Sequence, residues 1–156
     1  MENKIKKYHT PEAALQKLQS YCAYQERCHQ EVTAKLQELG MYGDKADAII
    51  AQLITDNFLN EERFAIAYAR GKFRIKHWGK IRIRQGLKQR YIPDFSIKKA
   101  IAAIDTEGGY LETLEKVIAT KAKDYEGDRQ KKHKLANYAL QRGFESELIW
   151  EVLKDF

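Results

Sequence analysis

Two cysteines and a histidine are the residues of this chain that come closest to a metal site. Cys22, Cys28 and His29 occur in the stretch CAYQERCH. A structural zinc site needs four ligands at tight spacings, and this stretch has neither zinc-finger nor zinc-ribbon spacing and no fourth ligand. We therefore expect no metal and no cofactor, and we interpret both cysteines as reduced thiols that pack in a helix as small apolar groups.

Residues for catalysis are no better grouped. The remaining histidines, His9, His77 and His133, are scattered among polar residues, and no serine lies in a nucleophile-elbow context. The glycine pair at 108–109 follows the letters IDTE and is interpreted as a hinge, because it lacks the pattern of a phosphate-binding loop. The sequence predicts a protein that is not an enzyme.

Positive charge is the chemistry that this chain does concentrate. The 28 positions from Arg63 to Arg90 contain ten Lys or Arg and no carboxylate, in a chain whose net charge is only +6. No acidic residue lies one helical turn away to neutralise them, so these charges repel one another unless an external anion is present. Nucleic-acid phosphates fit best, since Lys and Arg bind them strongly without reading sequence.

We predict that this segment forms a surface that binds nucleic acid. Trp78 has two interpretations: it stacks on a base, or, as is commoner for Trp-Gly at a helix junction, it anchors packing. The alternative for the whole segment is a solvated face balanced by acidic segments elsewhere in the fold. The predicted contact residues are Arg70, Lys72, Arg74, Lys76, Trp78, Lys80, Arg82, Arg84, Lys88 and Arg90.

The elements that carry these residues repeat along the chain. Each of three segments has an i, i+4 apolar pair, a break and a second apolar helix face. Gly40 and Gly143 occupy two of the breaks, where a helix C-terminus favours positive φ, and Tyr91 takes the equivalent place in the middle segment. The segments align at offsets of 51 and 52 residues and read VTAKLQELGMYGDKADAIIAQL, IRQGLKQRYIPDFSIKKAIAAI and LANYALQRGFESELIWEVLKDF.

A further amphipathic stretch precedes each pair, at residues 14–25, 61–76 and 110–122, with Asn60 as the predicted N-cap of the second. The sequence thus predicts an all-α fold of three tandem three-helix repeats, stacked into an elongated, curved, solenoid-like body. The predicted bounds are an N-terminal extension over 1–9, repeat 1 over 10–57, the basic repeat 2 over 58–106, and repeat 3 over 107–156.

Helical periodicity also predicts individual environments in repeat 2. Ile83 and Leu87 share a buried stripe, and Arg63 is expected to pair with a neighbouring carboxylate at the start of its helix. The aromatic residues predicted to be core are Phe64, Tyr68 and Phe73.

Membrane insertion and secretion are not indicated. The most hydrophobic stretch, AIIAQLI, is far too short to span a bilayer, and the start of the chain, MENKIKKYHT, lacks the apolar run of a signal peptide. We expect a cytoplasmic monomer.

The run EERFAIAYARGKFRIKHWGKIRIRQGLKQRYI, residues 61–92, resembles the hallmark of the RecX family, the bacterial regulators of the RecA recombinase. The resemblance extends over roughly residues 10–156. Three features depart from it: Lys80 stands where a proline is usual, the stretch before Arg63 is Asn60, Glu61 and Glu62 where Asp is often included, and Gly86 lies inside a helix, where glycine costs about 1 kcal/mol. The residues that carry the resemblance are Arg63, Phe64, Ala65, Tyr68, Trp78, Gly79, Ile83, Arg84, Leu87 and Ile92.

The resemblance implies a non-enzymatic modulator, mainly an inhibitor, of RecA that acts in recombination, DNA repair and the SOS response. It would bind the filament of RecA on single-stranded DNA, and secondarily duplex DNA, and restrain ATP hydrolysis, strand exchange and co-protease activity. The residues alone leave two alternatives: a free-standing helix-turn-helix-like regulator that reads DNA with the helix around Ile83 and Leu87, and a solenoid that binds only proteins.

Overall fold

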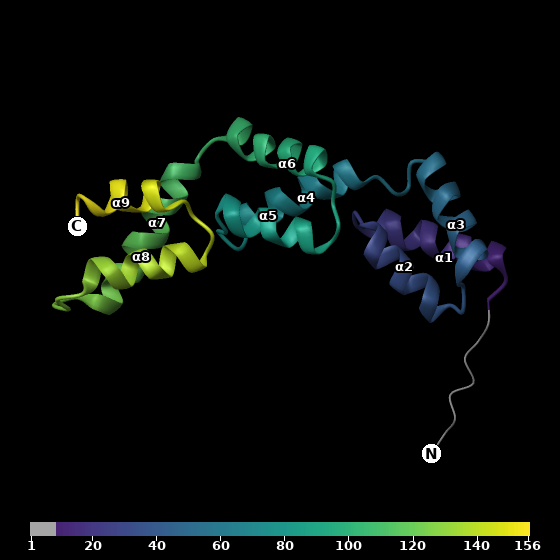
Figure 1. Cartoon of the computed structure of the whole chain (residues 1–156), viewed down its shortest axis with the longest axis horizontal. Coiled ribbons are helices and arrows are strands. Elements are labelled where there is room, and N and C mark those ends of the chain that lie inside the picture. Colours follow the sequence, from purple (N-terminus) through teal and green to yellow (C-terminus); the bar gives the residue numbers. More distant parts are fainter. Residues whose placement is uncertain (1–8) are drawn as a thin grey trace, which may run out of the picture. The chain divides into compact units, whose positions relative to one another are not determined.

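The computed structural model describes residues 9–156, and every regular element in that range is helical (Figure 1). The predicted all-α fold is therefore confirmed, while the predicted N-terminal extension lies outside the described residues except for His9. No helix of the described range is long and apolar enough to cross a membrane. The helices are α1 (Pro11–Tyr24), α2 (His29–Glu38), α3 (Gly43–Thr55), α4 (Glu61–Arg74), α5 (Lys80–Gln89), α6 (Asp94–Glu107), α7 (Tyr110–Ala122), the 3₁₀ turn η1 (Lys123–Tyr125), α8 (Lys131–Gln141) and α9 (Ser146–Leu153).

The chain packs as two units. The described part of the first unit comprises residues 9–64 and 90–92, and the second unit comprises residues 65–89 and 93–156. In chain order the helices form three groups of three, as the repeat pattern predicts. The repeat bounds 10–57, 58–106 and 107–156, and the elongated, curved body, remain predictions.

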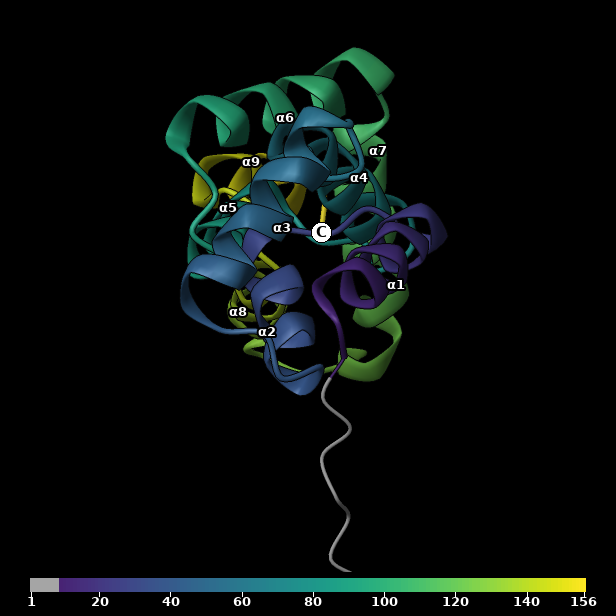
Figure 2. The same ribbon diagram turned by 90° about the vertical axis from the view of Figure 1, so that its right-hand side faces the viewer.

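The first unit is built on α1, α2 and α3, which lie around a common centre in Figure 2. Leu18, Leu36 and Leu53, one from each helix, are completely buried in this centre. The start of α1 is capped, because the Thr10 hydroxyl accepts a hydrogen bond from the Ala13 N–H at 3.1 Å. One apolar stripe on each helix therefore forms the core, as expected for amphipathic helices.

Both cysteines belong to this unit, and both are buried free thiols. Burial raises the pKa of the Cys22 thiol and that of the Cys28 thiol. Cys28 stands at the N-cap of α2, where its N–H donates to the Glu31 carboxylate at 3.4 Å. The interpretation of the cysteines as apolar packing groups within a helix is confirmed for Cys22 of α1. It is wrong in part for Cys28, which is buried but precedes α2, and whose thiol donates to the Glu31 carboxylate at 3.3 Å.

The alignment of the three segments is confirmed by burial. Of the fifteen apolar residues that it superimposes, all are buried except Ile50, which is half-buried. The three breaks also match, since φ is +77° at Gly40, +57° at Tyr91 and +95° at Gly143. The aligned apolar residues are Val32, Ile83 and Leu135; Leu36, Leu87 and Ala139; Met41, Ile92 and Phe144; Ala46, Ile97 and Ile149; and Ile50, Ile101 and Leu153.

The second unit contains the rest of α4 and helices α5 to α9. Ile83 and Leu87 of α5 are completely buried, as predicted, and α7, α8 and α9 enclose a separate cluster around Phe144. Of the predicted core aromatics, Phe64 and Phe73 are buried, whereas Tyr68 is half-buried.

Gly86 lies inside α5 and is also required for packing. A Cβ at this position would collide with the hydroxyl and ring of Tyr68. The expectation that Gly86 only weakens its helix is therefore incomplete, because the missing side chain makes room for a neighbouring aromatic ring.

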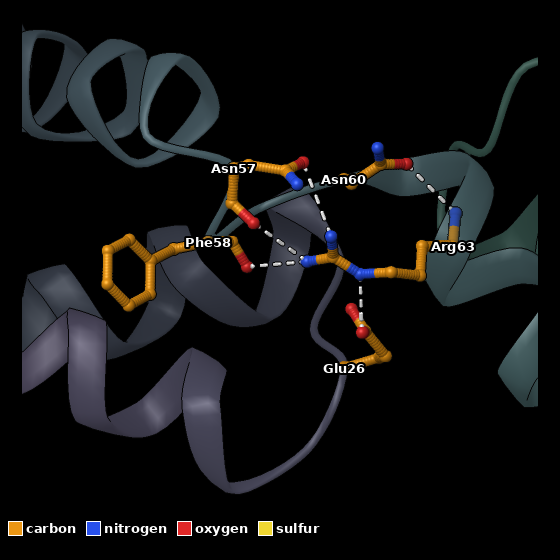
Figure 3. A network of polar contacts seen from close by, with 5 residues as sticks. All are labelled: Glu26, Asn57, Phe58, Asn60 and Arg63. Atoms are coloured by element: carbon orange, nitrogen blue, oxygen red, sulfur yellow. Dashed lines mark hydrogen bonds and ion pairs between the residues drawn. The ribbon is translucent and has the colours of Figure 1, made fainter.

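The start of α4 belongs to the first unit and is fixed by Arg63 and Asn60 (Figure 3). The Asn60 side chain caps the helix by accepting the Arg63 N–H at 2.9 Å. The Arg63 guanidinium donates to the Glu26 carboxylate at 2.5 Å and to the carbonyls of Asn57 and Phe58 at 3.0 and 3.3 Å. Both the predicted N-cap and the predicted ion pair are confirmed, and they tie α4 to the loop before α2.

We expect Arg63→Ala to lower the free energy of unfolding by about 2 kcal/mol. The Glu26 side chain is only 28% exposed and already has one buried oxygen without a partner, so losing its cation leaves a poorly solvated carboxylate. The urea midpoint should fall at an unchanged m value. Lys45→Ala, at an exposed cation of α3, is the matched control, and an equal midpoint in both variants would contradict a structural role for the Arg63 network.

Candidate nucleic-acid interface

Two of the predicted contact residues, Arg70 and Arg74, share one carboxylate. They lie one turn apart on α4 and are exposed, and both donate to Glu107 at the end of α6. The Arg70 Nε lies 3.1 Å from a Glu107 oxygen, and the Arg74 Nε lies 2.9 Å from the other. For this pair the alternative interpretation holds, because an acidic residue elsewhere in the fold balances part of the charge; two guanidinium groups and one carboxylate keep one net positive charge.

Lys80 is another cation of the segment that is balanced by a carboxylate elsewhere in the fold. Its ammonium lies 2.5 Å from the Asp105 carboxylate of α6 and 4.5 Å from the centre of the Tyr110 ring. Only 19% of its side chain is exposed. Lys80 thus joins α5 to α6 and α7, and little of its charge faces solvent.

Trp78 is enclosed by two cations. The Arg82 guanidinium lies 4.0 Å from the Trp78 ring centre and the Lys72 ammonium 4.8 Å from it. Arg82 also donates to the Gln141 carbonyl at 3.4 Å. The half-buried indole is therefore a packing anchor that holds Lys72 and Arg82 in place, and both cations keep their charge, since an aromatic ring does not neutralise it.

Among the described residues, Lys76, Arg84 and Lys88 are the exposed cations of the segment that have no carboxylate partner. All three side chains are exposed, and none forms an ion pair with a carboxylate among residues 9–156. Arg84 and Lys88 lie one turn apart on α5, on a flank beside the stripe of the buried Ile83 and Leu87. With Lys72 and Arg82, these residues are the cations of residues 65–89 that have no carboxylate partner within the described chain; together they are called the basic surface below.

Arg90 is the one predicted contact residue that belongs to the first unit. It is half-buried and lines a hollow of about 450 Å³ with Glu61 and residues of α2. It is not part of the basic surface as the structure describes it.

The Trp-Gly dipeptide is explained by a close approach of two backbones within the second unit. The Gly79 N–H donates to the Arg142 carbonyl at 2.8 Å, and the Ile81 N–H donates to the Gly143 carbonyl at 2.9 Å. A Cβ at Gly79 would collide with the Gly143 backbone, and a Cβ at Gly143 with Arg82. Only glycine fits at either position, so these two turns form a fixed joint between repeats 2 and 3.

Tyr110 completes this joint, and sequence reasoning did not single it out. Its hydroxyl donates to Glu145 at 2.5 Å and accepts the Lys80 N–H at 3.0 Å. Its ring contacts those of Phe73 and Phe144, with centroids 5.7 and 5.4 Å apart. Burial, and then the bond to Glu145, raise the pKa of Tyr110 far above its usual range. A proline at position 80 would have no backbone N–H to donate to this hydroxyl. The hydrogen bond therefore depends on Lys80 standing where a proline is usual.

We expect Gly79→Ala to lower the free energy of unfolding by about 1–3 kcal/mol, because the backbones of the joint must separate to admit the methyl group. Gly71→Ala is the matched control: it lies inside α4 with nothing within 4 Å of the added Cβ, and alanine should raise stability by up to about 1 kcal/mol. Urea midpoints measure both. Equal effects of the two substitutions would contradict the joint.

Within residues 9–156 no three His, Cys, Asp or Glu side chains are grouped so that they could hold a metal ion. The exposed cations of the basic surface support electrostatic contact with an extended anion.

Comparisons with known proteins agree on one family. Residues 60–101 match the family model for the second three-helix domain of RecX, and residues 109–153 match that for the third. The regulatory protein RecX of Prosthecochloris aestuarii is 28% identical over 142 residues, which are 91% of this chain and 92% of that protein. That of Bacillus mycoides is 28% identical over 87% of this chain, which spans only 52% of its length.

Solved structures share the fold. The crystal structure of RecX from Lactobacillus salivarius superimposes with a TM-score of 0.80 and 25% identity, over 93% of this chain and 95% of that one. A second crystal structure, of a regulatory protein RecX, has a TM-score of 0.82 over 94% of this chain and 73% of its own, with 23% identity.

Fold and site together define a regulatory protein assembled from three-helix domains, in which a basic middle domain is joined to the next through paired glycine turns. The chain belongs to the RecX family.

Proposed function

We propose that this chain regulates the RecA recombinase without catalysis of its own, by binding the filament of RecA on single-stranded DNA. In that position it restrains ATP hydrolysis, strand exchange and co-protease activity. Membership of a family of regulatory proteins supports this role, and the basic surface is the observation that carries the nucleic-acid contact.

The basic surface suits a phosphate backbone better than a specific base sequence. Lys76, Arg84 and Lys88 are exposed and free of carboxylates within the described chain, so each can approach a phosphate. Lys72 and Arg82 are held against Trp78 and add fixed charge at lower exposure. Contacts of this kind position a protein on nucleic acid and make its affinity depend on salt, with little dependence on sequence.

Arg70 and Arg74 have a different role in this proposal. Their shared bond to Glu107 holds α4 against the end of α6, and their remaining charge strengthens the local positive potential. Lys80 is a structural residue of the joint, and the half-buried Trp78 positions cations and does not stack on bases.

The direct test is ATP hydrolysis by the cognate recombinase on single-stranded DNA, titrated with this protein at fixed salt. We expect inhibition below one copy per recombinase monomer, because a regulator that interrupts filament growth affects many subunits at once. Full activity at saturating protein would contradict the proposal. If binding to one duplex sequence were then stronger than to others by several kcal/mol, a free-standing transcriptional regulator would take its place.

The double variant Arg84→Ala/Lys88→Ala tests the basic surface. We expect the slope of log affinity for single-stranded DNA against log salt to become shallower by about 1–2, with a matching loss of inhibition. Lys123→Ala/Lys132→Ala, two exposed lysines of repeat 3, removes the same charge and is the control. An unchanged slope in the α5 variant, with its helical circular dichroism intact, would remove Arg84 and Lys88 from the contact.

A further inference from the structure

A groove on α1 of the first unit gathers cations and tyrosines outside the basic surface. Its volume is about 650 Å³, and one wall is a stripe of α1 that includes Lys17, Tyr21 and Tyr24. Arg27, from the following loop, and Lys35 of α2 complete it. The stripe is separate from the buried face of α1, which carries Ala14, Leu18 and Cys22, so the groove is not part of the core.

The charge of this groove is opposite to that of the repeat around it. Residues 9–57 contain four Lys or Arg against seven Asp or Glu, yet three of the four cations line the groove and no carboxylate does. Glu31 and Glu38 lie beside it and pair with Arg27 at 3.5 Å and Lys35 at 3.2 Å. Lys17 forms no ion pair among residues 9–156. The three cations and these two carboxylates leave the groove one net positive charge within an acidic repeat, which favours an anionic ligand.

The two tyrosines differ in their contacts and in their exposure to solvent. The Arg27 guanidinium lies 3.7 Å from the Tyr21 ring centre, and its Nε donates to the Tyr21 carbonyl at 3.0 Å, so this ring is held in place. Tyr24, the last residue of α1, is 83% exposed. A fixed ring and an accessible ring, flanked by cations along about 10 Å of helix, form the arrangement that binds single-stranded nucleic acid by base stacking and phosphate contact.

We infer that this groove is a second binding site for single-stranded nucleic acid. Tyr24 stacks on a base, Lys17 and Lys35 contact phosphates, and Arg27 positions Tyr21 as the floor of the groove. An acidic peptide would use the same cations but would leave the exposed Tyr24 ring without a flat partner, so bases are the better fit. The inference deepens the proposed function by adding a nucleic-acid contact in the first repeat, and it does not depend on the basic surface.

The test is fluorescence anisotropy of a labelled oligothymidylate titrated with the full chain. We expect Tyr24→Ala to weaken binding about tenfold and Tyr24→Phe to leave it unchanged, since the ring and not the hydroxyl stacks. Lys17→Ala should make the salt slope shallower by about 1. Tyr42→Ala and Lys45→Ala, at an exposed tyrosine and an exposed lysine of the same unit outside the groove, should change neither quantity.

Binding of the oligothymidylate to Tyr24→Ala at wild-type affinity would overturn the inference. So would loss of oligoglutamate binding in Lys17→Ala with oligothymidylate binding unchanged, because the groove would then bind an acidic protein segment. Recombinase inhibition is measured separately. Tyr24-dependent DNA binding without inhibition would contradict only the proposed regulatory function, and inhibition without Tyr24-dependent binding would contradict only this inference.

Discussion

The contact between two glycine turns is the constraint on which the second unit depends. Gly79 and Gly143 bring their backbones so close that no Cβ fits between them, and two backbone hydrogen bonds cross the contact. The Tyr110 hydroxyl bonds to both the Lys80 N–H and the Glu145 carboxylate, and so satisfies polar groups that are partly buried beside the contact. Trp78 precedes the first of these glycines, so the joint also determines where Lys72 and Arg82 can lie. The position of the basic surface thus follows from a steric requirement.

Within residues 63–90, two kinds of cation can be distinguished by their charge partners. Arg63, Arg70, Arg74 and Lys80 are bonded to carboxylates and join helices or loops. Lys76, Arg84 and Lys88 face solvent and have no such partner within the described chain. The ion pairs of the first kind join parts of the fold, and they leave less positive charge available for binding. The cations of the second kind keep their charge unbalanced at positions that a polyanion can reach. A segment that looks uniformly basic therefore has both structural and binding residues.

Local patterns in the amino-acid sequence explain which features of the fold could be predicted. Helix faces and breaks depend on neighbours three or four residues away, so the aligned segments correctly identified buried residues such as Ile83 and Leu135, and the left-handed turn at Tyr91. The family resemblance rested on residues 61–92, and the matches to the second and third RecX domains confirm it. The predicted contact set remains a prediction; its ten positions lie in one stretch, and only the structure shows which of them are paired with carboxylates and which contact the Trp78 ring.

The sequence by itself determined the helices, their buried faces, the repeat of about fifty residues and the family, because each is encoded in periodicity or in a short run of residue types. Tertiary structure decided which charges remain available. Glu107 is 33 residues from Arg74, and Asp105 is 25 residues from Lys80, so no spacing rule along one helix relates them. The same holds for the α1 groove, where Lys35 of α2 joins Lys17 and Tyr24 only after the first unit has folded. Ion pairs and grooves depend on distance in space, and that distance is set by packing.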